Sequence, residues 1–177
     1  MRHAHILSKI NEEYQRSDEE FVTAFRSKYS DSFPPSWITM EITSFGTLSI
    51  LYNNLLPGRA KRSIASYFGL PDTVFASWLH SIVYIRNICA HHCRLWNRTL
   101  SIRPLMPRSP HQPFIALPAS GTRQVYFLLS MIVYLLDIIN PNHSFVERFR
   151  SLLSAYPSID TRAMGFPVNW ENEVIWK

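Results

Sequence analysis

Side chains that can carry protons and bind phosphate concentrate in one short segment of the chain, residues 86–98. The segment reads Arg-Asn-Ile-Cys-Ala-His-His-Cys-Arg-Leu-Trp-Asn-Arg and contains three Arg and two His. A histidine can take up or release a proton near neutral pH, and an arginine can neutralise charge that builds up on phosphoryl oxygens. Because the ribose 2′-OH already lies next to its own phosphate, these two groups suffice to cleave RNA. The segment therefore predicts RNA cleavage that requires no metal ion or other cofactor.

The pair Arg86 and His91 supplies the cation and the proton carrier of this chemistry. Asn87 lies four residues before His91, so on a helix the two side chains share a face. We expect Asn87 to orient the imidazole or to contact the phosphate. Three further side chains are predicted to bind neighbouring phosphates of the RNA: Tyr84, Arg94 and Arg98.

An amphipathic pattern predicts that these residues lie on a long helix, which begins at Asp72 as its N-cap and ends at about Arg98. At 100° per residue, one apolar arc contains Val74, Phe75, Trp78, Ile82, Ile85, Cys89, Cys93 and Trp96. The opposite side forms a polar stripe of His80, Tyr84, Asn87, His91, Arg94 and Arg98. Arg86 is expected at the edge of the apolar arc, from which its long side chain can reach either face.

Basic residues are distributed unevenly along the chain. Residues 59–123 contain nine Lys or Arg and a single acid, Asp72, whereas residues 1–58 have a net charge of −2 and residues 124–177 a net charge of −1. The stretch from Thr73 to Arg123 contains six Arg and no acid at all. A basic zone made only of arginine suggests a phosphate-bearing partner, although a charge run by itself also fits a solvated face.

The rest of the chain is predicted to be helical, because glycine is scarce and the twelve prolines cluster between the apolar segments. The expected helices are 5–16, a capping-box helix from Ser17 to about Tyr29, 37–56 with Ser36 as cap, 59–68, 122–139, and 142–155 with Asn142 as cap. Residues 101–119 contain five prolines and predict an extended arm, and the tail from Pro157 is predicted to be irregular, with short turns around Ala163 and Trp170. We therefore expect a single all-α domain over residues 1–177.

Several features bear on localisation. The N-terminus contains no signal-peptide pattern, so we expect a cytoplasmic protein. The longest apolar run, residues 125–139, is shorter than the roughly 20 residues that span a bilayer, so it predicts a core helix or a dimer seam rather than a membrane span. Cys89 and Cys93 lie one helical turn apart, which fits a reducing compartment better than a disulfide framework.

Three sequence blocks together resemble the Abi-like abortive-infection family (AbiD/AbiF type), a branch of the HEPN superfamily. The blocks are Ser-Trp-Ile-Thr-Met-Glu-Ile-Thr-Ser-Phe-Gly at 36–46, Ser-Trp-Leu at 77–79, and the segment 86–98. Their combination is specific, whereas an Arg and a His with four residues between them occur often by chance. The resemblance covers about residues 20–120, and it implies that a helical segment usual in the family is missing before this chain begins.

The resemblance implies a HEPN-like helical bundle with metal-independent endoribonuclease activity, built where two copies of the motif face each other in a homodimer. The implied role is bacterial antiphage defence or toxicity to the host cell, with RNA as the substrate and no membrane contact. Further partners would be an antitoxin or a small RNA. By residue, Arg86 would stabilise the phosphate, Asn87 would be the polar companion, and His91 the acid and base. His92 fits a spacer one residue longer, but helix geometry favours His91 because His92 points toward the apolar arc.

Three alternatives accompany this interpretation. Cys89, His92 and Cys93 share a helical face and could supply three ligands of a zinc site. The arginine zone could instead bind RNA or another partner without cleaving it. Structural roles are also expected for some residues: Trp78 and Trp96 as core aromatics, His92 as a core or interface histidine, and the Arg86–His91 pair in a salt bridge or cap.

Overall fold

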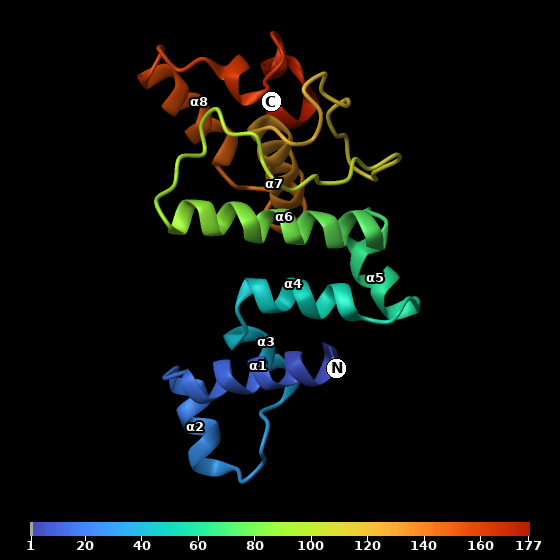
Figure 1. The fold of residues 1–177 in the computed structure, drawn as a ribbon, viewed down its shortest axis with the longest axis vertical. Helices are drawn as coiled ribbons and strands as arrows, with labels where there is room; N and C mark the ends of the chain where they lie inside the picture. Colours follow the sequence, from blue (N-terminus) through green and yellow to red (C-terminus); the bar gives the residue numbers. More distant parts are fainter. Residues whose placement is uncertain (1) are drawn as a thin grey trace. The chain divides into compact units, whose positions relative to one another are not determined.

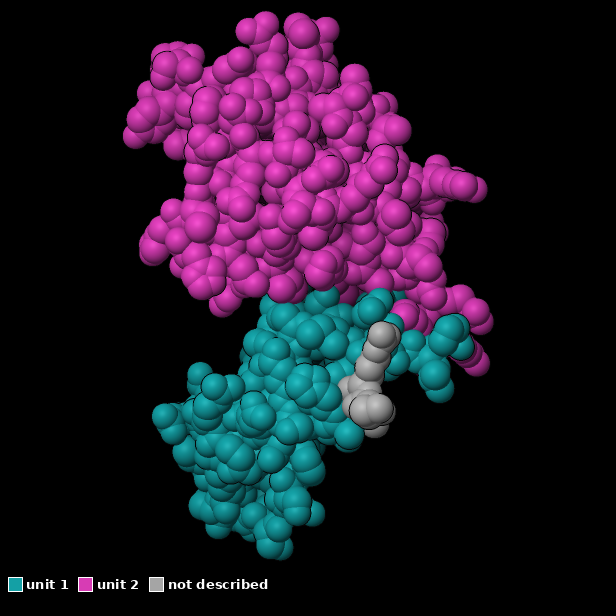
Figure 2. Space-filling view, viewed as in Figure 1, with its two compact units in different colours: residues 1–57 teal, residues 58–177 magenta. Residues whose placement is uncertain are grey.

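The chain folds into helices, as predicted (Figure 1). The computed structural model describes residues 2–177, with side chains from Ala4 onward, and within that range it contains eight α-helices, three short 3-10 helices and no strand. It divides into two compact units, residues 1–57 and residues 58–177, which are coloured separately in Figure 2. The expectation of a single domain over the whole chain stays a prediction.

Unit 1 (residues 1–57) is a small four-helix assembly. Its helices are α1 (Arg2–Arg16), α2 (Glu20–Lys28), α3 (Ser36–Ile42) and α4 (Phe45–Asn54). The core of the unit contains Tyr14, Val22, Phe25 and Ile38, with Ile42 packed against it. The prediction of a helix ending at residue 16 is confirmed, while Glu19 rather than Ser17 is the N-cap of α2 and makes no side-chain cap bond.

The predicted single helix over 37–56 is wrong, because the chain breaks between α3 and α4. Thr43 and Ser44 have extended ψ angles of 130° and 147°, and the Ser44 hydroxyl accepts a hydrogen bond from the Thr47 N–H at 3.2 Å. The carboxylate of Glu13, on α1, accepts bonds from the Ser44 N–H at 2.9 Å and the Thr47 hydroxyl at 2.8 Å. A side chain 31 residues away thus stabilises the start of α4.

Glu13→Gln is expected to lower the free energy of unfolding of unit 1 by about 1 kcal/mol at pH 7. Partial burial would raise the pKa of Glu13, but the hydrogen bonds from Ser44 and Thr47 outweigh it and lower the pKa. Because the folded pKa is lowered, this contribution is present above the pKa of an unfolded glutamate, about 4.3, and is lost as the pH falls through the folded value. Urea unfolding at several pH values measures it.

The neighbouring substitution Glu12→Gln is the matched control, because Glu12 lies on the same helix and is exposed. The difference between the Glu13 variant and the wild type should shrink toward zero in acid, while the Glu12 variant should track the wild type throughout. Equal effects of the two substitutions would contradict a capping role for Glu13.

Unit 2 (residues 58–177) is built around two long helices, α6 and α7, which pack against each other. The α-helices of this unit are α5 (Arg59–Tyr67), α6 (Asp72–Ala90), α7 (Val125–Ile139) and α8 (Phe145–Ala155). Most of α7 is buried, so the apolar run at 125–139 is a core helix. No helix in the described part of the chain, residues 2–177, is long and apolar enough to cross a membrane.

Two predicted caps in unit 2 are wrong. Pro71, not Asp72, is the N-cap of α6, and the Asp72 carboxylate accepts a bond from the N–H of the next residue, Thr73. Ser144, not Asn142, precedes α8. Asp72 lies one residue after the observed N-cap of α6, and Asn142 lies two residues before that of α8.

The tail, residues 157–177, contributes to a cluster of aromatic rings in unit 2. The turns predicted around Ala163 and Trp170 are confirmed as η1 (Thr161–Met164) and η2 (Trp170–Asn172), and η3 (Val174–Trp176) follows. Trp176 is fully buried and donates a hydrogen bond from its indole nitrogen to the Ser130 hydroxyl of α7 at 3.0 Å. Its ring lies among those of Tyr126, Phe149, Phe166 and Trp170.

The proline-rich arm, residues 101–119, has no regular secondary structure, as predicted, and is fixed to α6. The Leu105 N–H donates to the Ser77 hydroxyl at 3.0 Å, and the indole nitrogen of Trp78 donates to the Leu105 carbonyl at 2.8 Å. Pro104 and Pro107 are buried three residues apart, the repeat of a polyproline II helix. We call the contact of Ser77 and Trp78 with Leu105 the arm clamp. It gives the Ser-Trp-Leu block a structural role, and Trp78 is a core aromatic as predicted.

Candidate functional site

Helix α6, the long green helix of Figure 1, ends at Ala90, so the prediction of a helix to Arg98 is wrong. The His92 N–H donates to the Cys89 carbonyl and the Cys93 N–H to the Ile88 carbonyl, both at 3.0 Å. These two bonds form a Schellman motif, with His91 as C-cap and His92 in the left-handed position at φ +52°. Glycine normally occupies that position, which is why the residue types gave no sign of the helix end.

The predicted apolar arc does not continue beyond Ile85. Val74, Phe75, Trp78 and Ile85 are buried as expected. Three members of the arc that follow are exposed instead: Cys89, Cys93 and Trp96. Trp96 has 40% of its surface exposed, so it is not a core aromatic. His92 is exposed as well and does not lie in the core.

The proposed catalytic residues are exposed and lie at the C-terminal end of α6, Arg86 and Asn87 within the helix and His91 and His92 just after it. One Arg86 guanidinium nitrogen donates to the Asn87 side-chain oxygen at 3.2 Å, and the Asn87 main-chain carbonyl accepts the N–H of His91 at 3.0 Å. The Asn87 side chain therefore holds the Arg86 guanidinium, whereas its bond to His91 is a main-chain bond of the helix end and does not involve the imidazole. Arg86 and His91 are exposed, which does not support the alternative of a buried salt bridge.

The predicted phosphate-binding residues are also at this end of α6. Arg98 donates to the Arg94 carbonyl at 3.4 Å, and the Ser101 hydroxyl donates to the Tyr84 phenol oxygen at 2.9 Å. Within the part of the chain that the structure describes, no carboxylate forms an ion pair with Arg86, Arg94 or Arg98. These guanidinium charges thus remain available for an anionic ligand.

Ser101 is the residue that the sequence reasoning missed. It contacts Tyr84 across 17 residues of chain, from the first position of the proline-rich arm. No periodic pattern connects a loop serine to a helix tyrosine at such a separation, so only the arrangement of the arm on α6 reveals the pair.

The zinc alternative loses its geometric basis. Because α6 ends at Ala90, Cys89, His92 and Cys93 no longer share a helical face. Among the side chains that the structure describes, from Ala4 to Lys177, no group of three or more His, Cys, Asp or Glu could hold a metal ion. The two cysteines are free and exposed thiols.

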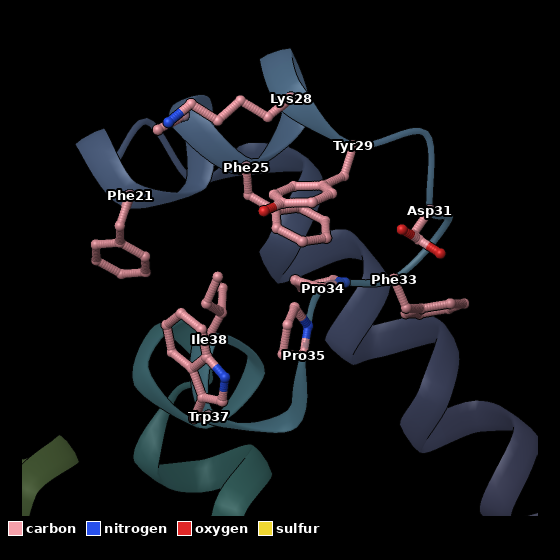
Figure 3. A pocket seen from close by; sticks show the side chains of 11 residues that line it. Phe21, Phe25, Lys28, Tyr29, Asp31, Phe33, Pro34, Pro35, Trp37 and Ile38 are labelled. Carbon is pink, nitrogen blue, oxygen red and sulfur yellow. The ribbon is translucent and has the colours of Figure 1, made fainter.

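Unit 1 contains an open pocket of about 670 Å³ that the sequence analysis did not single out (Figure 3). The rings of Phe25 and Tyr29 stack at 4.9 Å on one side of it, and Trp37 and Ile38 lie on the other. Its charged lining residues are Lys28 and Asp31. Because its lining contains no histidine or arginine, this pocket is not a candidate for the proton and phosphate chemistry.

His92→Gly is expected to raise the thermal unfolding temperature by about 2 °C, because glycine adopts a positive φ without steric cost. His91→Gly is the matched control: His91 has an ordinary φ of −91°, so the same exchange relieves nothing there. Differential scanning calorimetry of the two variants measures the difference. A lower unfolding temperature for the His92 variant would mean that its imidazole makes a contact worth more than the strain.

Residues 1–97 match the model of a protein family described as Abi-like protein. The matched range includes unit 1, α5, α6 and the residues Arg86, Asn87, His91 and Arg94, and it ends one residue before Arg98. No curated protein and no solved structure matches the chain.

Proposed function

The chain belongs to the Abi-like protein family, and on this premise we propose that it is an endoribonuclease of bacterial abortive-infection defence against phage. The observation that carries the proposal is the exposed Arg86 and His91 at the C-terminal end of α6, within a zone that has six arginines and no acid. Of the functions consistent with the family, RNA cleavage is the one that this pair of side chains serves directly.

In the proposed reaction, His91 takes the proton of the ribose 2′-OH as the 2′-oxygen attacks phosphorus. The O2′–P bond forms, the P–O5′ bond breaks, and the leaving 5′-oxygen receives a proton. Arg86 neutralises the charge that develops on the two other phosphoryl oxygens. The products are a 2′,3′-cyclic phosphate and a 5′-hydroxyl.

The reaction needs a base and an acid at the same time, and one imidazole cannot serve as both. We infer that two copies of the chain form a HEPN-like composite site, in which one His91 accepts the proton and the second copy's His91 donates one. His92, the other candidate histidine, is the alternative donor; it is exposed and has the left-handed backbone of the helix end at φ +52°.

The test is incubation of the purified protein with a single-stranded oligoribonucleotide in EDTA, followed by analysis of the product ends. Cleavage to 2′,3′-cyclic phosphate and 5′-hydroxyl ends is expected. Cleavage that needs Mg²⁺ and leaves 5′-phosphates would overturn the mechanism, since it indicates a metal-activated water. Light scattering on the same sample measures the oligomeric state, and full activity in a monomer would contradict the composite site.

A second candidate function is binding of RNA or another partner without cleavage, and the open exposure of His91 in a single chain favours it. In that case His91→Ala would leave RNA affinity unchanged, Arg94→Ala would weaken it, and no product would form under any condition.

A further inference from the structure

Tyr84, Arg98 and Ser101 form a polar cluster where the arm joins α6. The Ser101 hydroxyl donates to the Tyr84 phenol oxygen, which therefore acts as an acceptor in this bond. The phenol keeps its own proton for a second acceptor outside the cluster. The cluster thus places a hydroxyl donor near the guanidinium of Arg98, whose charge acts on the phenol.

The guanidinium of Arg98 gives the cluster a positive charge. The hydrogen bond from Ser101, opposed by slight burial and assisted by the Ser101 main chain and the charge of Arg98, lowers the pKa of Tyr84. No carboxylate is present in the sequence from Thr73 to Arg123. Such surroundings favour an anion at the phenol hydroxyl.

The cluster is held in place before any ligand arrives. Next to Ser101, the Leu100 N–H donates to the Arg123 carbonyl at 2.9 Å, and the Arg123 guanidinium donates back to the Leu100 carbonyl at 2.6 Å. The arm clamp fixes the chain again four residues later. A site whose parts are already ordered loses less entropy when it binds.

We propose that Tyr84, Arg98 and Ser101 form a subsite for a phosphodiester of the RNA that is not the one cleaved. This inference rests on the proposed function and deepens it, because it specifies the substrate as a strand that extends past the cleavage point. Tyr84 precedes His91 by seven residues, which is about 10 Å along the helix axis. At about 3.4 Å per nucleotide of a stacked strand, the subsite lies about three nucleotides from the cleaved bond.

The experiment measures the affinity of the full chain for two fluorescent 2′-deoxy oligonucleotides, a dinucleotide and a hexanucleotide, by anisotropy. The deoxy probes lack the 2′-OH and cannot be cleaved by the proposed reaction, so binding is separated from activity. Tyr84→Phe and Ser101→Ala are each expected to weaken binding of the hexanucleotide about threefold to tenfold and to leave the dinucleotide unchanged. Arg98→Ala should also reduce the salt slope of hexanucleotide binding by about 1.

Matched controls use the same residue types elsewhere in unit 2. Tyr67 is 70% exposed and Ser109 lies further along the arm, so Tyr67→Phe and Ser109→Ala should bind both probes as the wild type does. Circular dichroism melts of all variants confirm that the fold is retained. If a variant is unfolded, the milder exchange Ser101→Thr, which keeps the hydroxyl, must restore hexanucleotide binding for the proposal to stand.

The outcomes separate this inference from the proposed function. Equal weakening of both probes, or no weakening of either, would overturn the subsite even if RNA is cleaved. Hexanucleotide binding that depends on Tyr84 and Ser101 supports the subsite even if no RNA is cleaved, and the ribonuclease proposal alone would then fail.

Discussion

His91→Ala is expected to slow RNA cleavage by about 100-fold to 10,000-fold while leaving the unfolding temperature of the protein nearly unchanged. The loss follows from the removal of the proposed proton carrier. The fold should persist because His91 is an exposed C-cap whose main-chain bond to Asn87 survives the exchange. Single-turnover cleavage of an oligoribonucleotide, with the melting curve of each variant, tests both statements.

Three companion experiments test whether His91 is the proton carrier. Arg86→Ala should cause a loss of similar size, and the double variant should be little worse than either single one, because residues that act as a unit are not additive. Added imidazole should restore part of the activity of His91→Ala but not of Arg86→Ala. His80→Ala is the matched control, since His80 is an exposed histidine of the same helix. Cleavage that persists in both single variants would place the active site elsewhere or in a contaminant.

Trp78→Ala is expected to lower the free energy of unfolding of unit 2 by about 3–5 kcal/mol. Trp78 is fully buried, its ring lies 5.2 Å from that of Phe114 and 5.4 Å from that of Tyr134, and its indole nitrogen closes the arm clamp. Its removal leaves a cavity and an unpaired carbonyl together. Urea unfolding followed by circular dichroism measures the loss.

Trp96→Ala is the control for the large change in side-chain size, because Trp96 is 40% exposed and should cost less than about 1 kcal/mol. Trp78→Phe keeps most of the volume but lacks the bond to Leu105, and it should fall between the two. Hydrogen exchange of the Leu105 amide should accelerate in both Trp78 variants if the clamp holds the arm. Protection equal to the wild type would mean that the bond from the Leu105 N–H to Ser77 holds the arm without the help of Trp78.

Much of the fold could be predicted because the helices follow apolar periodicity and proline ends them. The helix that ends at Arg16, the core helix at 125–139 and the extended arm all follow from local pattern. The break at Thr43–Ser44 depends on a bond from Glu13, which is distant in sequence. The burial of Trp176 depends on how the tail packs against α7. Neither this packing nor the bond from Glu13 produces a periodic pattern in the sequence.

In the candidate site, too, some features follow from the local sequence pattern and others depend on how distant segments pack. The exposure of His80 and Asn87 agrees with the predicted polar stripe, because side chains of one helical face are exposed together. His91 and Arg94 are also exposed, but they follow the end of α6, so their exposure does not come from a shared helical face. The end of α6 was missed because a histidine takes the left-handed position that glycine usually marks. Ser101 was missed because its contact with Tyr84 arises only after the arm has packed. The catalytic and phosphate-binding roles themselves stay predictions.

Most substitutions of Leu105 should leave the arm clamp intact, because Ser77 and Trp78 bind the main-chain N–H and carbonyl of this residue and not its side chain. The Leu105 side chain is 47% exposed, and every residue except proline presents the same two main-chain groups. The side chains on the exposed surface of the arm can therefore be substituted while Ser77 and Trp78 continue to hold its main chain on α6. The charge and shape of this surface can thus change, and with them the partners that it binds, without a change in the helix.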